Sequence, residues 1–166
     1  MSYGIMMWGN STHTKKVFML QKKCIRILAN ANPKASCRIL FRKLNIMTIY
    51  AQYIYSLALH TVSNMHLFIA NDEIHGYETR ANKDLHRPSP NSTKYTKGPY
   101  YTAIKVYNHL PRSLKDLAPN QKRFKYTLKR FLCQHSFYSI KEFFDYKEHM
   151  WKLHHMLDDN DFYISL

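Results

Sequence analysis

Residues 14–31 read TKKVFMLQKKCIRILANA, and this stretch indicates the fold class. An α-helix advances about 100° per residue, so apolar residues three and four positions apart gather on one face. One such face holds Val17, Leu20, Cys24, Ile27, Leu28 and Ala31. The opposite face holds Lys15, Lys16, Lys22, Lys23 and Arg26. We therefore predict a helix that buries the apolar set and exposes the cations. The Asn32-Pro33 pair is expected to end it.

Further helical patterns occur on both sides of a long loop. Residues 36–44 and 48–64 are predicted helices, and the tyrosines and isoleucines of the second have the spacing of a core stripe. Residues 71–98 hold prolines, glycines and small polar residues without periodicity, which is typical of a loop or linker. Helical periodicity returns at residues 100–110, and a short helix is predicted at residues 139–146.

A third strong helix is predicted from Asn120 onward. Its apolar face holds Phe124, Leu128, Phe131, Leu132 and His135. A separate row of Lys122, Lys125 and Lys129 is flanked by Arg123 and Arg130. Taken together, the patterns predict an all-α fold, a small irregular helical bundle with a long central loop. The expected regions are a helical part at 1–70, the loop at 71–98, a second helical part at 99–146 and an acidic tail at 147–166.

Charge is distributed unevenly along the chain. The formal net charge is +14, and no carboxylate precedes Asp72. Cations without neighbouring anions suit a phosphate backbone, whose binding depends largely on ion release. The same stretch excludes chemistry that needs Asp or Glu. A lysine-rich solvated surface is the alternative interpretation.

Catalytic and cofactor sites have little support in the sequence. The cysteines, Cys24, Cys37 and Cys133, are far apart and odd in number. The Cys133-Gln134-His135 and His154-His155 groupings lack zinc-module spacing, so we expect neither a metal nor another cofactor. No nucleophile elbow or phosphate-cradling glycine loop occurs, and we expect no small-molecule substrate.

The expected compartment is intracellular, cytoplasmic or nuclear. No basic region precedes an apolar core at the N-terminus, so no secretory signal is predicted. The most apolar run, residues 46–59, is too short to span a bilayer.

Several motifs in order resemble the region downstream of the palm in jockey-type non-LTR retrotransposon reverse transcriptases. They are Ser2-Tyr3-Gly4, Trp8-Gly9-Asn10, Leu20-Gln21-Lys22-Lys23, Ile25-Arg26-Ile27, Thr79-Arg80, Tyr107-Asn108-His109-Leu110-Pro111, Leu114-Lys115, the run from Phe124 to Leu132, and His135-Ser136-Phe137-Tyr138. The resemblance implies the helical thumb and C-terminal region of an RNA-directed DNA polymerase. In that family the thumb grips the template–primer duplex, and the upstream palm holds the catalytic aspartates.

The resulting hypothesis is a truncated, catalytically inactive polymerase fragment that retains sequence-independent binding to RNA or DNA backbones. The Asp158-Asp159 pair superficially resembles a polymerase turn, but we interpret it as part of an exposed acidic tail. The expected phosphate contacts are Lys15, Lys16, Lys22, Lys23, Arg26, Lys122, Arg123, Lys125, Lys129 and Arg130.

Three alternatives remain open. The chain could be a helical module that binds proteins or an anionic membrane without a nucleic-acid role. It could be a polymerase in its own right. It could also fail to fold alone, if its apolar faces evolved to pack on a palm.

Overall fold

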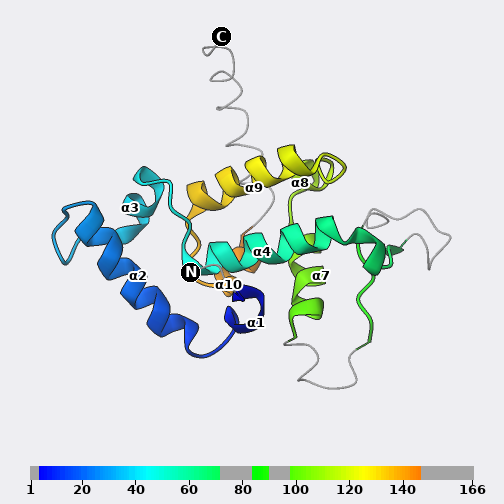
Figure 1. Cartoon of the computed structure of the whole chain (residues 1–166), viewed down its shortest axis with the longest axis horizontal. Helices are drawn as coiled ribbons and strands as arrows, with labels where there is room; N and C mark the ends of the chain where they lie inside the picture. Colours follow the sequence, from blue (N-terminus) through cyan, green and yellow to red (C-terminus); the bar gives the residue numbers. More distant parts are fainter. Residues whose placement is uncertain (1–3, 72–83, 90–97, 147–166) are drawn as a thin grey trace, which may run out of the picture.

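The computed structural model describes residues 4–71, 84–89 and 98–146, and within them the regular structure is helical (Figure 1). An isolated antiparallel bridge joins Ala70 to Leu85, and no strand occurs in these ranges. The prediction of an all-α fold is therefore confirmed. Most of the predicted central loop and the whole acidic tail lie outside the described residues. In chain order the helices are α1 (Ile5–Trp8), α2 (Thr14–Leu28), α3 (Cys37–Lys43), α4 (Ile49–Ser63), the 3-10 helix η1 (Met65–Leu67), α7 (Pro99–His109), α8 (Arg112–Lys115), α9 (Gln121–His135) and α10 (Ile140–Asp145).

Helix α4 is the centre of the fold. It packs against α1, α2, α7, α9 and α10, so the helices before and after the central loop share one core. Its predicted core stripe is confirmed, because Tyr53, Ile54 and Leu57 are each at most 1% exposed. The ring of Tyr53 lies directly against Gly9. A Cβ at Gly9 would sit 2.7 Å from Tyr53 Cγ and 2.7 Å from the Ile5 carbonyl oxygen, which leaves room only for glycine.

The start of α4 is held by two polar side chains. Thr48 is the N-cap: its hydroxyl accepts from the Ala51 N–H at 3.1 Å and donates to the Phe137 carbonyl at 2.6 Å. From α2, the Gln21 amide accepts from the Ile49 N–H and donates to the Met47 carbonyl, both at 2.9 Å. Backbone groups that helix geometry leaves unpaired at this end are thus paired by side chains.

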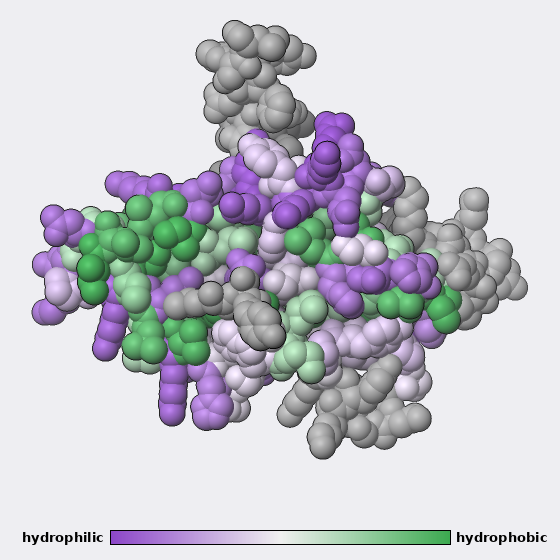
Figure 2. Space-filling view, in the orientation of Figure 1, coloured by the Kyte–Doolittle hydropathy of each residue, from purple (hydrophilic) through white to green (hydrophobic). Residues whose placement is uncertain are grey.

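The predicted buried face of α2 is wrong. The buried residues are Thr14, Phe18, Gln21 and Ile25, which lie about 100° around the helix from the predicted set. Of that set, Leu20, Cys24, Ile27 and Leu28 are exposed, and Val17 and Ala31 are only partly buried. Figure 2 shows the hydrophobic residues that gather on the outer surface in the region of α2.

The reason for this orientation lies in residues distant in sequence. Phe18 packs edge-on against Tyr138 and Tyr50, with ring centroids 4.9 and 5.3 Å away. Gln21 meets the start of α4, as described above. These contacts favour an aromatic and an amide on the inner side of α2, so the second apolar sector of the helix turns outward.

The C-terminal helices follow their predictions more closely. Phe124, Leu128, Phe131 and Leu132 of α9 are buried, as predicted, and His135 packs beside the Phe131 ring at 4.6 Å. Ser136 ends α9 in a left-handed conformation, at φ 49°.

Candidate nucleic-acid interface

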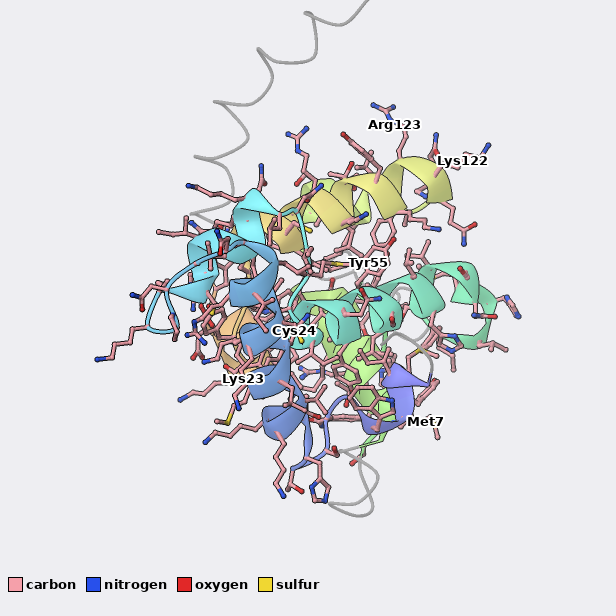
Figure 3. The ribbon with its side chains drawn as sticks, turned by 60° about the vertical axis from the view of Figure 1, so that its left-hand side comes forward. Met7, Lys23, Cys24, Tyr55, Lys122 and Arg123 are labelled. Atoms are coloured by element: carbon pink, nitrogen blue, oxygen red, sulfur yellow. The ribbon has the colours of Figure 1, made fainter. Side chains whose placement is uncertain are left out.

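The five predicted cations of α2 divide into two groups. Lys15, Lys16 and Lys23 are exposed, and Figure 3 shows Lys23 on this helix. Lys22 and Arg26 are half-buried and have intramolecular partners. The Lys22 ammonium lies 5.2 Å from the centre of the Phe18 ring, and the Arg26 Nε donates to the Ala35 carbonyl at 3.0 Å. These two side chains therefore support the packing of α2, whatever else they bind.

The predicted cations of α9 are mostly exposed. Lys122 and Arg123 project outward at the start of the helix (Figure 3). Lys125 and Lys129 are exposed further along. Arg130 is half-buried and lines a pocket against α3. The row predicted from sequence thus lies on solvent and is separate from the apolar face of α9.

Both helices begin with cations and without carboxylates. Lys15 and Lys16 occupy the first turn of α2, and Lys122 and Arg123 the first turn of α9, where no acidic residue occurs. The N-terminal end of a helix carries a partial positive charge, so cations there are unfavourable and anions favourable. Helix stability therefore does not account for these four side chains. A bound anion would offset their mutual repulsion.

The cations of α2 and the cations of α9 do not form one compact patch. Helix α3 packs against both α2 and α9 and lies between them (Figure 1). Its exposed Arg42 and Lys43 add cations to this connection. Arg38 of α3 is engaged elsewhere, because its guanidinium contacts Glu142 of α10 at 2.5 Å and lies over the Tyr138 ring. Arg42 and Lys43 thus extend the basic surface, whereas Arg38 links α3 to α10.

A small open pocket of about 210 Å³ lies between α3 and α9. No carboxylate lines it. Burial raises the pKa of the Cys133 thiol, and nearby Lys129 offsets part of that effect, so the thiol stays neutral at pH 7. The pocket adds Arg42 to the candidate residues. No sequence signal could pair Arg42 with Arg130, because 88 positions separate them. The lining residues are Arg42, Asn45, Arg130, Cys133 and Gln134.

A second pocket has mixed charge, and the described residues offer no metal cluster and no membrane-spanning helix to set beside the basic surface. A pocket beside α7 mixes Asp84 and His86 with Arg87 and Lys105, so its charge is not of one sign. Asp84 also accepts from the Lys115 ammonium at 2.7 Å. Among the described residues, no three His, Cys, Asp or Glu side chains gather in a way that could hold a metal ion. In the same ranges no helix combines the length and the apolar character that crossing a bilayer would require. The His154-His155 and Asp158-Asp159 pairs lie outside these ranges.

Comparison with known proteins gives no family model, no curated protein and no solved structure that matches the chain.

Proposed function

We propose that this chain binds the phosphate backbone of nucleic acids without reading their sequence. The observation that carries the proposal is the pair of helix starts, where Lys15 and Lys16 in α2 and Lys122 and Arg123 in α9 stand in a first turn that contains no acidic residue. Phosphate groups suit such positions, since they pair with the cations and with the positive end of the helix. Contacts of this kind position a duplex, and backbone contacts alone carry no sequence information.

The proposed origin is the thumb and C-terminal region of a jockey-type reverse transcriptase. Its support is the ordered resemblance of the motifs, not any match to a known protein. In this proposal the natural ligand is a template–primer duplex of RNA and DNA. The proposal assigns the chain no catalytic step, because two-metal phosphoryl transfer needs clustered carboxylates and the residues invoked here are cations.

Some residues that carry the resemblance have structural roles in this chain. Asn108 follows Tyr107 on α7, and its side-chain amide makes two 2.8 Å hydrogen bonds with the backbone of Leu85. Gln21 holds the start of α4. Such residues account for part of the motif pattern through folding, and the exposed cations remain for binding.

Fluorescence anisotropy with labelled RNA–DNA duplexes of scrambled sequence would test the proposal. We expect every duplex to bind with similar affinity. We also expect log K to fall linearly with log salt, by about 0.9 for each phosphate contact. Binding that is absent at low salt, or that is flat as salt rises, would refute it. Strong preference for one sequence would contradict the claim that only the backbone is bound.

A further inference from the structure

The outward side of α2 has the spacing of a helix that packs on another helix. Val17, Leu20, Cys24 and Ile27 recur at intervals of three, four and three residues, the repeat of a coiled-coil seam. We call these four residues the α2 seam. Leu20 is 57% and Ile27 78% exposed, and Leu28 beside them is 67% exposed. Val17, at the start of the seam, is partly buried and packs against the core, so the part of the seam open to a partner runs from Leu20 to Ile27.

Charges beside the seam indicate the chemistry of the partner. Lys16 and Lys23 are seven residues apart, and each directly precedes a seam residue, at the flanking position that pairs with a partner's charges in helix pairs. Both are exposed, and residues 4–71 contain no carboxylate that could pair with them. A second copy of this chain suits the surface poorly, because each copy carries a net charge of +14.

We propose that the α2 seam binds an amphipathic α-helix of a partner protein, with apolar residues at the same spacing and Glu or Asp beside them. The seam from Val17 to Ile27 is about 15 Å long, which corresponds to about three turns of the partner helix. This inference does not depend on nucleic-acid binding. It does imply that an acidic helix and a duplex compete for Lys16 and Lys23, but not for the cations of α9.

Cys24 supplies a direct reporter of the seam. It is exposed and lies within the row (Figure 3). Cys37 and Cys133 are buried. The probe is a synthetic peptide of about 15 residues with leucine at the seam positions and glutamate beside them. The matched peptide has lysine in place of glutamate. Mass spectrometry measures the rate at which a neutral maleimide alkylates each cysteine of the full chain at constant pH.

We expect the glutamate peptide, at about four times its dissociation constant, to slow alkylation of Cys24 about fivefold by mass action. Cys37 and Cys133 are buried and should stay unmodified with or without either peptide, and the lysine peptide should give Cys24 no protection. No protection by the glutamate peptide, or equal protection by both peptides, would overturn the proposal.

Two neighbouring residues provide a matched pair of variants. Leu20 and Met19 are similarly exposed, at 57% and 54%, but only Leu20 belongs to the seam. We expect Leu20→Ser to remove the protection and Met19→Ser to leave it. Equal loss in both variants would contradict a seam-specific site. Protection of Cys24 by vesicles of phosphatidylserine and phosphatidylcholine, without protection by the glutamate peptide, would replace the proposed helix with an anionic lipid surface.

Discussion

Exchange of the polar and apolar side chains at two adjacent positions of α2 tests which face of this helix is buried. Gln21→Leu removes an amide that pairs with Ile49 N–H and Met47 carbonyl oxygen, each at 2.9 Å. Ile49 is 1% exposed, so its N–H has little access to water in the variant. A buried polar group that loses its partner costs about 1–3 kcal/mol.

The expected loss in the free energy of unfolding is about 2 kcal/mol, because the half-buried Met47 carbonyl can be hydrated and added apolar burial offsets part of the loss. In a chain of this size that corresponds to a fall in melting temperature of about 4–8 °C. Leu20→Gln changes a side chain that is 57% exposed, and its effect should stay within about 0.5 kcal/mol.

Urea denaturation followed by circular dichroism measures both effects, provided that the denaturant slope is unchanged between variants. The burial pattern predicted from sequence alone gives the reverse order, with Leu20→Gln the damaging change. If Leu20→Gln costs more than Gln21→Leu, the orientation of α2 described here is wrong.

Three further predictions concern packing, acid stability and thiol access. Gly9→Ala should destabilise the fold by about 1–3 kcal/mol in the same urea assay, because its Cβ would collide with the ring of Tyr53; a neutral effect would disprove that close approach. Partial burial alone would raise the pKa of Glu142, but hydrogen bonds from Arg38 and from a backbone N–H outweigh it and lower the pKa. The ion pair therefore stabilises the fold above the ordinary pKa near 4.5 and loses that contribution as pH falls through the lowered value. Since both side chains are about one-third exposed, Glu142→Gln should cost only about 0.2–1 kcal/mol at pH 7, and the cost should shrink steadily as the pH falls below 4.5; a cost that stays constant as the pH falls would contradict this. Finally, Cys24 should be alkylated in native buffer, whereas Cys37 and Cys133 should react only after denaturant is added. Simultaneous reaction of all three thiols would contradict the burial of Cys37 and Cys133.

The sequence was most informative where one helix face is clearly apolar. In α9, Phe124, Leu128 and Leu132 alternate with lysines that cannot be buried unpaired, so both faces could be assigned in advance. In α4 the tyrosine and isoleucine stripe likewise predicted its burial. Helix class and core followed from periodicity in these two elements.

Helix α2 shows where periodicity fails. It carries two apolar sectors, one around Phe18 and Ile25 and one around Leu20 and Ile27, and spacing cannot choose between them. The choice depends on Tyr138, which is 120 positions from Phe18. A glutamine on the buried side could be predicted only if its backbone partners were already known.

The basic surface was predictable in composition but not in arrangement. Exposure of Lys122 and Arg123 followed from their opposition to the apolar face of α9. The intramolecular roles of Lys22 and Arg26 depend on contacts with an aromatic ring and a loop carbonyl. Long-range contacts of this kind leave no pattern in one sequence.

The salt dependence of duplex binding after removal of the cations that begin α9 tests the central claim most directly. The double variant Lys122→Ser and Arg123→Ser is compared with Arg87→Ser and Lys141→Ser, which removes the same charges from exposed positions outside α2 and α9. If both side chains contact phosphates, the first variant should lower the slope of log K against log salt by about 1.8, or 0.9 for each contact. The control should leave that slope close to the wild-type value. An unchanged slope in the first variant, or an equal reduction in the control, would contradict a nucleic-acid interface at the start of α9.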